Sequence, residues 1–420
     1  MEPEQKLKVF LVGGAVRDSI LGNPVKDRDW VVVGATPQQM LDQGFIPIGK
    51  DFPVFLHPKT KEEYALARTE RKTGKGYRGF KVISDPKITL EQDLRRRDLT
   101  MNAIARDPDG NLIDPFGGER DLKQGVIRHV SDAFREDPVR ILRAAKFAAR
   151  YQGNGFQIHP DTRKLMQYMV AQGEADALVA ERVWAELEAV LIQGNVARFI
   201  EELARCHALA RVLPEVNALF GVPQVEKYHP EVDTGIHTLM ALKALEQLGG
   251  DPLLRFAVLL HDLGKARTPP SEYPSHRAHE YRGIRPINQL CDRLRVPKRY
   301  RLLALKVCEL HLHCHRLFEL RPGTIVKMLE KMDAFRQPEV VDQFALCCEA
   351  DKRGRAGFET RPYPQRVHLL HLYQKLTEID ARKIAQQCKD KSKIKEALTK
   401  ARIRVISEQQ VTGSGYHPNT

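Results

Sequence analysis

The order of apolar and polar positions divides the chain into a first part with short apolar strands and a longer part with helical periodicity. Up to about residue 130, short apolar runs are separated by turn-rich links. Such runs are typical of strands, and the sequence predicts four of them at Val9–Val12, Trp30–Val33, Val54–Leu56 and Glu63–Ala67. Residues 1–130 therefore predict a mixed α/β domain.

From about residue 131 the pattern becomes helical. Asp137-Pro138 fits an N-cap followed by proline at the first helical position, so a helix is expected over Val139–Tyr151. A second strong helix begins at Ala180, and its Trp184 is expected to be a core residue. Three basic side chains recur at intervals of three and share one face of the first helix: Arg140, Arg143 and Lys146.

These changes of pattern predict an α+β multidomain protein with four parts. We expect a mixed α/β head at residues 1–130 and a helical neck at residues 131–222, which ends in a proline-rich break. A helical body at residues 223–355 and a basic helical tail at residues 356–420 follow. The segment Asp114–Gly118, rich in glycine and proline, is expected to be a hinge.

The first apolar strand runs into Gly13-Gly14, and two aspartates open the second strand. Residues i and i+2 of a strand face the same side, so Asp27 and Asp29 are expected to point together and to bind Mg²⁺, which prefers oxygen ligands. The glycines allow backbone N–H groups to approach a phosphate, and Arg17 follows at a distance suited to clamp it. Glu63 is a further candidate carboxylate.

A dense arginine cluster precedes Asp98 in the segment Glu91–Asn102, which predicts the start of a helix. Arg97 suits an anionic phosphate and Asp98 suits a ribose hydroxyl, since a carboxylate accepts from O–H. The alternative is an exposed helix in which Asp98 pairs only with Arg95. The basic, glycine-rich stretch Arg71–Phe80 predicts a loop.

Composition narrows the class of protein. The chain has 420 residues, 42% of them hydrophobic, and a net charge of +13, which favours a polyanionic partner such as RNA or DNA. No apolar run is long enough to cross a membrane, and the polar start gives no sign of a signal peptide. Seven cysteines without a spacing pattern favour free thiols in the cytoplasm, and Cys347-Cys348 is expected in the core.

The body contains a histidine and aspartate set of its own. His261-Asp262 closes an apolar helix, His237 lies on the helix before it, and Asp351 lies far downstream. Imidazoles and carboxylates suit Ni, Mn, Fe or Co, which activate water, so these four residues predict a metal site. His311, His313 and His315 fit either a solvated cluster or ligands of a second metal.

Several motifs of the chain resemble those of class II nucleotidyltransferases, the family of CCA-adding enzymes and bacterial poly(A) polymerases. The resemblance is closest to bacterial CCA-adding enzymes with an HD phosphohydrolase domain. It rests on Gly13–Asp18, Asp27–Asp29, Arg96–Asn102, Asp114–Gly118, Glu136–Arg143, Glu181–Trp184 and His261–Gly264. Lys146 departs from the pattern, since many relatives have arginine there.

The resemblance implies a Mg²⁺-dependent enzyme that adds and repairs the 3′-terminal CCA of tRNA from CTP and ATP. Gly14, Arg17, Arg97, Asp98, Arg143 and Lys146 would bind the nucleotide. Asp137 and Arg140 would select C and A, because each base presents an amino donor beside a bare ring nitrogen. The body would use Ni²⁺ or another transition metal to hydrolyse 2′,3′-cyclic phosphates, 2′-nucleotides or phosphate monoesters.

Two alternative functions stay open at this point. A poly(A) polymerase or A-adding enzyme has the same head chemistry, but the HD segment counts against it. A phosphohydrolase whose head merely binds RNA is opposed by the intact Asp27 and Asp29 pair. The basic segment Ala381–Arg404 predicts a helix that is either solvated or in contact with a phosphate backbone. We expect a monomer or a dimer.

Overall fold

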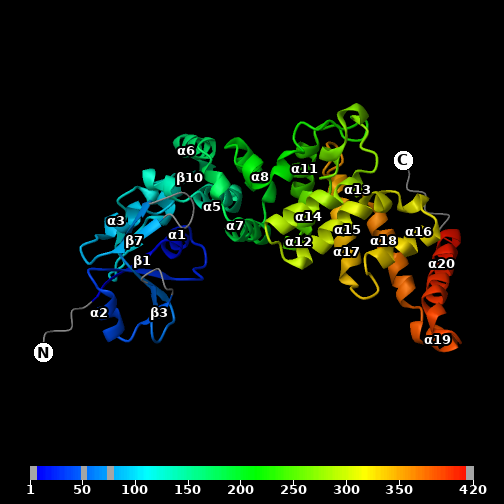
Figure 1. Ribbon diagram of the computed structural model, residues 1–420, viewed down its shortest axis with the longest axis horizontal. Coiled ribbons are helices and arrows are strands. Elements are labelled where there is room, and N and C mark those ends of the chain that lie inside the picture. Colours follow the sequence, from blue (N-terminus) through cyan, green and yellow to red (C-terminus); the bar gives the residue numbers. More distant parts are fainter. Residues whose placement is uncertain (1–6, 49–53, 73–79, 413–420) are drawn as a thin grey trace. The chain divides into compact units, whose positions relative to one another are not determined.

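The computed structural model describes residues 7–48, 54–72 and 80–412, which fall into two compact units (Figure 1). The first unit comprises the chain up to Leu187 together with Arg198–Val212. The second comprises Glu188–Ala197 and the chain from Leu213 onward. Most of the expected loop at Arg71–Phe80 and the end of the chain from residue 413 lie outside the described residues.

The first unit is built on a seven-stranded sheet with the order β3-β4-β5-β2-β1-β8-β9. Its strands are β1 (Lys8–Val12), β2 (Asp29–Val33), β3 (Ile46–Ile48), β4 (Val54–Leu56), β5 (Glu63–Leu66), β8 (Ala105–Arg106) and β9 (Leu112–Ile113). β2 pairs with β5 in parallel, and the other neighbours pair antiparallel. The four strands expected from the apolar runs are therefore present as β1, β2, β4 and β5.

Strand register brings the start of β2 to the end of β1. Asp29 lies opposite Val12 of β1 and opposite Glu63 of β5. One position on, Trp30 lies opposite Tyr64, and their rings stack with centroids 5.6 Å apart. Tyr64 also meets Phe45 edge-on at 5.0 Å. Because side chains alternate along a strand, carboxylates and aromatic rings occupy successive positions of the same two strands.

Short helices and a hairpin complete the head. The helices are α1 (Gly14–Ile20), α2 (Pro37–Asp42), α3 (Leu90–Arg95) and α4 (Gly118–Lys123), and the hairpin pairs β6 (Arg68–Lys72) with β7 (Phe80–Ser84). Gly13 precedes α1 with φ 69°, a left-handed conformation that glycine adopts without strain. Val12, Val31 and Leu94 join one buried cluster of the head, which fixes the sheet against α3.

Two segments of the head were singled out from the sequence. A helix starts at the first of them as expected and ends at Arg95, and a separate 3₁₀ turn forms at Thr100–Asn102. At the expected hinge, the carboxylate of Asp114 accepts hydrogen bonds from the backbone of Gly118 and Glu119, both at 2.8 Å. A Cβ on Gly118 would lie 2.2 Å from the carbonyl oxygen of Thr100. That segment is therefore tied down by capping and close packing.

The helical part of the first unit follows the head. Its elements are α5 (Val139–Arg150), α6 (Pro160–Ala171), α8 (Val196–Arg205) and α9 (Leu209–Val212), and α7 (Ala180–Gln193) begins in this unit. A short parallel pair, β10 (Val126–Ile127) with β11 (Gln157–Ile158), interrupts the helices. Trp184 of α7 is buried, as its apolar setting predicts.

Helices joined by loops make up the described residues of the second unit, apart from an isolated bridge between Pro223 and Asp233. Its helices are α10 (Pro214–Asn217), α11 (Thr234–Gln247), α12 (Pro252–Leu260), α13 (His279–Arg282), α14 (Ile284–Arg293), α15 (Lys298–His315), α16 (Pro322–Lys331), α17 (Glu339–Arg353), α18 (Pro364–Thr377), α19 (Ala381–Gln387) and α20 (Ile394–Thr412). α11, α12, α15 and α17 pack against one another and form its centre. Cys347 and Cys348 on α17 are buried there, as expected.

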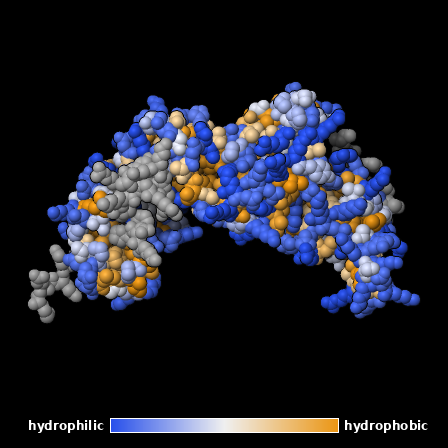
Figure 2. Space-filling view, in the orientation of Figure 1, coloured by the Kyte–Doolittle hydropathy of each residue, from blue (hydrophilic) through white to orange (hydrophobic). Residues whose placement is uncertain are grey.

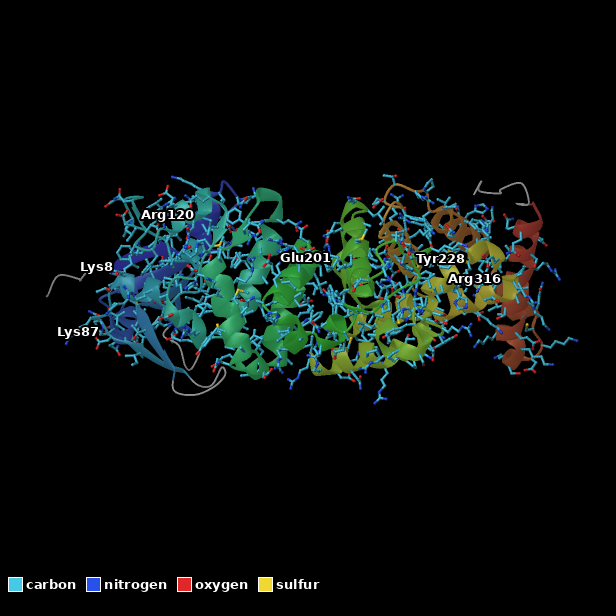
Figure 3. All side chains as sticks on the ribbon, turned by 90° about the horizontal axis from the view of Figure 1, so that it is seen from above. Lys8, Lys87, Arg120, Glu201, Tyr228 and Arg316 are labelled. Atoms are coloured by element: carbon cyan, nitrogen blue, oxygen red, sulfur yellow. The ribbon has the colours of Figure 1, made fainter. Side chains whose placement is uncertain are left out.

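The basic segment near the C-terminus forms two helices instead of the single helix expected over Ala381–Arg404. α19 ends at Gln387, and Asp390 caps a 3₁₀ turn before α20 begins. Side chains with nitrogen ends extend from the α20 region in Figure 3, and hydrophilic residues cover much of the visible surface of each unit in Figure 2. Among the described residues, no helix is long and apolar enough to span a membrane.

Candidate functional site

A pocket of about 710 Å³ lies in the first unit, where the Gly13-Gly14 turn meets the start of β2. Five carboxylates and seven arginines line it. The carboxylates are Asp29, Glu63, Asp98, Asp137 and Glu186, and the arginines are Arg17, Arg68, Arg96, Arg97, Arg140, Arg143 and Arg182. This excess of positive charge suits a ligand that carries several negative charges, such as a nucleoside triphosphate.

Asp29 is a pocket carboxylate whose position is set by the register of the sheet. It is the first residue of β2, beside Glu63 on β5 and next to the turn that starts α1. Burial raises the pKa of Asp29, and the negative charge of Asp27 raises it further, while Arg97 opposes the shift. Asp27 is thus close enough to repel Asp29, although it precedes the strand and is exposed. A bound cation would relieve that repulsion.

Arg17 lines the pocket from α1 and is buried. Its guanidinium donates to Asp18 at 3.0 and 2.9 Å and to Oδ1 of Asn102 at 2.7 Å. It also lies 4.9 Å from the ring centroid of Phe147 on α5. These contacts hold the guanidinium in place before any phosphate binds.

Asp98 is a buried carboxylate of the pocket that accepts three hydrogen bonds. It accepts hydrogen bonds from the backbone of Leu99 at 2.8 Å, from Asn102 at 3.0 Å and from Nε of Arg143 at 2.6 Å. Burial raises its pKa, but the charge of Arg143 and the hydrogen bonds outweigh burial and lower the pKa to about 2. Arg95, the partner considered from the sequence, pairs with Glu91 instead.

Arg97 stands between the arginine cluster and the glycine turn. Its guanidinium donates to Asp93 at 3.2 Å and to the carbonyl of Asn102 at 3.4 Å. A Cβ on Gly13 would lie 3.0 Å from Nη1 of Arg97. Glycine at position 13 therefore lets this guanidinium approach the turn beside Asp29.

The expected pair of Asp137 and Arg140 is arranged differently. Both side chains line the pocket, but Arg140 donates to the carbonyls of Ala133 and Arg96, both at 2.7 Å. Arg182 on α7 donates two hydrogen bonds to the carboxylate of Asp137, at 3.0 and 2.6 Å. Asp137 also accepts from the backbone of Val139 at 3.1 Å, but the N-cap of α5 is Pro138, one residue later than the sequence suggested.

Arg182 is a pocket residue to which sequence reasoning gave no role. It lies in the Glu181–Trp184 motif at the start of α7, and only the packing of α7 beside α5 brings it to Asp137. Lys146, in contrast, is not part of the pocket lining, and its Nζ lies 2.5 Å from a carboxylate oxygen of Glu186.

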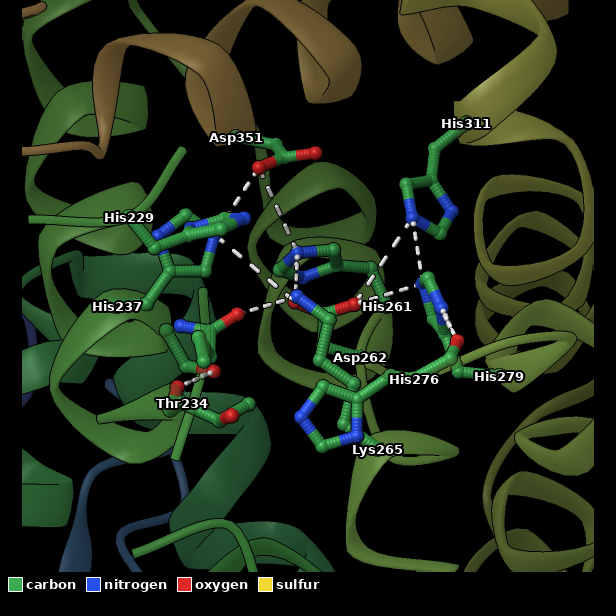
Figure 4. A network of polar contacts seen from close by, with 12 residues as sticks. His229, Thr234, His237, His261, Asp262, Lys265, His276, His279, His311 and Asp351 are labelled. Atoms are coloured by element: carbon green, nitrogen blue, oxygen red, sulfur yellow. Dashed lines mark hydrogen bonds and ion pairs between the residues drawn. The ribbon is translucent and has the colours of Figure 1, made fainter. Parts of the chain in front are cut away.

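The second unit brings together the four residues expected to bind a metal (Figure 4). His237 comes from α11, His261 and Asp262 directly follow α12, and Asp351 comes from α17. All four are buried. Nε2 of His237 lies 3.0 Å from Oδ1 of Asp351, and Nε2 of His261 lies 3.2 Å from Oδ2 of Asp262. His237, His261 and Asp351 are close enough to share one ion.

Surrounding groups orient these ligands. Nδ1 of His261 faces the carbonyl of Val258 at 2.7 Å, and Nδ1 of His237 faces Glu231 at 2.9 Å. Since the carbonyl only accepts, Nδ1 of His261 carries the proton and its Nε2 presents a lone pair. The contact of His237 with Glu231 is an ion-pair distance, and Nδ1 of His237 has no hydrogen bond of good geometry there. Nε2 of His315 lies 2.6 Å from Oδ2 of Asp351, while Nδ1 of His315 faces the hydroxyl of Tyr363 at 2.9 Å. His315 therefore positions Asp351.

The donor set suits a divalent transition metal. Imidazole nitrogen and carboxylate oxygen are the ligands that Mn, Fe, Co, Ni and Zn share. Lys265 also donates to Oδ2 of Asp262 at 2.7 Å and to Gln224 at 2.5 Å, which fixes the aspartate. Of the three further histidines noted on α15, His311 lies near Asp262, His315 holds Asp351, and His313 belongs to neither contact.

Three family descriptions match consecutive parts of the chain. Residues 9–128 match the poly A polymerase head domain, and residues 155–220 match a probable RNA and SrmB-binding site of polymerase A. Residues 234–348 match the HD domain. The first match contains the glycine turn and Asp29, and the third contains His237, His261 and Asp262.

Full-length relatives and solved structures agree with this order. The multifunctional CCA protein of Teredinibacter turnerae is 56% identical over 400 residues, covering 95% of this chain and 97% of the relative. A CCA-adding enzyme in complex with CTP shares the fold with a TM-score of 0.63 at 21% identity, over 97% of this chain and 91% of that one. The Thermotoga maritima CCA-adding enzyme complexed with tRNA has a TM-score of 0.62 at 20% identity, with the same coverage.

The resemblance inferred from the motifs is thereby confirmed, and so is a mixed α/β head followed by a mostly helical remainder. Nucleotidyltransferase and HD domains both imply the use of divalent metal ions. The chain belongs to the family of multifunctional CCA proteins.

Proposed function

We propose that this enzyme adds and repairs the 3′-terminal CCA of tRNA without a nucleic-acid template, using CTP and ATP. The 3′-hydroxyl of the tRNA attacks the α-phosphate of the nucleotide, and pyrophosphate leaves. The pocket carries the proposal, because it sets Asp29 and Glu63 beside the glycine turn and faces them with arginines. The full-length identity to a multifunctional CCA protein supports the same activity.

In this proposal Asp27 and Asp29 hold Mg²⁺, with Glu63 as a third carboxylate. Mg²⁺ there would lower the pKa of the attacking hydroxyl and neutralise the leaving pyrophosphate. The backbone of Gly14 and the side chains of Arg17 and Arg143 bind the triphosphate. Arg97 and Asp98 bind phosphate and ribose. Lys146 has a weaker case for nucleotide contact, because it is not part of the pocket lining and its charge is paired with Glu186, which is.

Asp137 and Arg140 select the base. A carboxylate accepts from the exocyclic amino group of cytosine or adenine, and a guanidinium donates to the adjacent ring nitrogen. Uracil and guanine present the reverse pattern and are opposed. Arg182 supports this role, because its two hydrogen bonds fix the direction of the Asp137 carboxylate.

The second unit acts as a metal-dependent phosphohydrolase on 2′,3′-cyclic phosphates, 2′-nucleotides or phosphate monoesters. His237, His261, Asp262 and Asp351 hold Ni²⁺ or another transition metal in this proposal. Such an ion supplies a water nucleophile at neutral pH and polarises the phosphate. The protein orients the ligands through Val258, Glu231 and His315, as the hydrogen bonds of His261 and Asp351 and the close contact of Glu231 with His237 support.

The partner is tRNA, and the enzyme works in the cytoplasm. The net charge of +13 and the nine basic against two acidic residues over Ala381–Arg404 favour a phosphate backbone. Six of the seven cysteines are buried, and all seven are free thiols, which suits a reducing compartment. The Thermotoga maritima relative is described as complexed with tRNA, which agrees with this partner.

Incubation with a tRNA that lacks its 3′ end tests the head. Labelled CTP and ATP together should add a single CCA, while CTP alone should add only cytidines. An unbounded A-tail would favour a poly(A) polymerase instead. Asp29→Ala should abolish incorporation, and Arg163→Ala, which breaks an ion pair with Glu202 away from the pocket, should retain it.

Hydrolysis of a 2′,3′-cyclic nucleotide with Ni²⁺ tests the second unit. His261→Ala should lose hydrolysis and keep CCA addition, and Asp29→Ala should do the reverse. Loss of both activities in His261→Ala, with the variant still folded, would contradict two separate sites. The rate without added metal, after treatment with a chelator, is the matched control.

A further inference from the structure

A pocket of about 460 Å³ in the second unit is lined by three arginines and, among the described residues, by no carboxylate. Its lining comes from a 3₁₀ turn over Lys265–Arg267, from α13 and from α14. The lining residues are Arg267, Tyr281, Arg282, Arg285, Pro286 and Gln289. Several guanidinium groups around one hollow favour a ligand that carries phosphate groups.

Two of these arginines are free to bind such a ligand. Arg282 donates hydrogen bonds of 3.1 to 3.2 Å to both carboxylate oxygens of Glu272, so its charge is already balanced. Arg267 and Arg285 are exposed, and neither forms an ion pair within the part of the chain that the structure describes. Two like charges around one pocket repel each other, and a bound anion relieves that repulsion.

A tyrosine ring and an amide complete the pocket. Tyr281 is 56% exposed, and no other ring of the described residues stacks on it. Single-stranded nucleic acids stack their bases on such rings, while basic side chains beside them hold the backbone. The amide of Gln289 can both donate to and accept from a base edge or a 2′-hydroxyl. A free phosphate ion would leave the ring and the amide unused, so the lining favours a strand of RNA.

The elements that form this pocket begin beside Asp262. Nζ of Lys265 lies 2.7 Å from Oδ2 of Asp262, and Arg267 is only two residues further along the chain. Nε2 of His279 lies 3.3 Å from Oδ1 of Asp262, and Tyr281 follows His279 by two residues. Two residues span at most about 7 Å. The pocket therefore adjoins the proposed phosphohydrolase centre.

We propose that this pocket binds the RNA strand that precedes the phosphate ester hydrolysed by the second unit. Arg267 and Arg285 hold the phosphodiester backbone, and Tyr281 stacks on a base. This subsite rests on the proposed phosphohydrolase for the ester itself, and it names the substrate as the end of a polynucleotide. A free 2′,3′-cyclic nucleotide occupies the centre alone and gains nothing from the pocket.

Hydrolysis of two substrates by the full chain tests the subsite. One substrate is 2′,3′-cyclic AMP, and the other is a short single-stranded RNA that ends in a 2′,3′-cyclic phosphate. We expect kcat/KM to be about tenfold higher for the RNA, because stacking and phosphate contacts add to its binding. When Arg267→Ala and Arg285→Ala are combined, the ratio of the two kcat/KM values should fall toward one. Equal values in the unchanged protein would overturn the proposal and leave the phosphohydrolase standing.

Binding of the same RNA, measured by fluorescence anisotropy, tests the pocket without turnover. The slope of log Kd against log salt should fall by about 0.7 for each arginine removed. Tyr281→Ala should raise Kd about tenfold, and Tyr281→Phe, which keeps the ring, should restore it. Arg321→Ala is the matched control, because Arg321 is an exposed arginine of the same unit outside the pocket lining.

The two measurements separate the subsite from the reaction. An unchanged Kd and salt slope in the combined arginine variant would overturn the proposal. Binding that depends on the two arginines, without hydrolysis of either substrate, would instead contradict the proposed phosphohydrolase and leave the RNA subsite standing.

Discussion

The two candidate sites balance their charges in opposite ways. In the pocket of the first unit, Arg17, Arg143 and Arg182 already bind carboxylates of the same unit. In the histidine centre of the second unit, ring nitrogens of His279 and His311 and an oxygen of Asp262 face one another. The pocket is therefore preorganised by the chain itself, whereas we expect the histidine centre to gain stability from bound metal.

Removal of metal should have the largest effect, because it should lower the stability of the second unit and leave that of the first unit unchanged. Chelation should destabilise the second unit by about 4 kcal/mol, the linkage expected for an ion present at a thousand times its Kd. The first unit should unfold as before. Both tryptophans, Trp30 and Trp184, belong to the first unit, so their fluorescence reports on it alone. Hydrogen exchange of α11, α12 and α17 reports on the second unit.

If α11, α12 and α17 were equally protected from hydrogen exchange with and without chelator, the second unit would not depend on metal for its stability. His237→Gln is the control, because it removes one of the expected metal ligands. In that variant the effect of chelation on the second unit should shrink, and tryptophan fluorescence should still show no change.

Loss of Arg182 should have the next largest effect. Arg182→Ala removes two hydrogen bonds from Asp137, each of the charge-assisted kind, and about 2 kcal/mol of transition-state stabilisation should be lost. This is about a 30-fold fall in kcat/KM for CTP and ATP. Discrimination against UTP and GTP should weaken as well, because the carboxylate loses its fixed direction.

Steady-state incorporation of the four nucleotides into tRNA measures both kcat/KM and the discrimination against UTP and GTP. Arg163→Ala removes an arginine that pairs with Glu202 and lies outside the pocket lining, so it controls for the loss of an ion pair in the same unit. Unchanged kcat/KM and unchanged discrimination in Arg182→Ala would show that Asp137 is oriented by its other contacts.

Acid should reveal the third effect, through Asp98. Its pKa is lowered from 3.8 to about 2 in the folded protein, so the unfolded chain takes up the proton first as the pH falls. The stabilisation is present above about pH 4 and disappears as the pH falls toward 2, a loss of about 2 kcal/mol. Urea unfolding followed by tryptophan fluorescence at several pH values measures it.

Asp98→Asn serves as the reference protein for that titration. The stability gap between the wild type and Asp98→Asn should be largest above pH 4 and should narrow toward pH 2. A gap that stays constant over this range would show that the ion pair of Asp98 with Arg143 contributes nothing to the stability of the first unit.

Local sequence pattern predicts the elements that present the two sites. Short apolar runs predict β1 and β2, and the position of Asp29 at the start of a strand follows from them. His261-Asp262 follows an apolar helix, as the periodicity of residues 252–260 indicates. These features depend on neighbours in the sequence, so a single chain without its fold is sufficient to predict them.

Contacts between distant elements could not be predicted in the same way. Asp137 and Arg140 are three residues apart, yet Asp137 pairs with Arg182 because α7 packs beside α5. His279 could not be joined to His311 from the sequence, because 32 residues separate them and a short helix, α13, sets the direction of the first ring. The tail helix also breaks at Asp390, where capping competes with helical periodicity.

The parallel pairing of β2 with β5 determines which substitutions outside the pocket would impair catalysis. Asp29 and Glu63 are neighbours only in the observed register, and a slip of one residue would turn one carboxylate to the opposite face of the sheet. The stacked rings of Trp30 and Tyr64 occupy the next pair of positions and oppose that slip. Substitutions among aromatic residues such as Phe45 would thus impair catalysis by misaligning acidic groups that they do not touch.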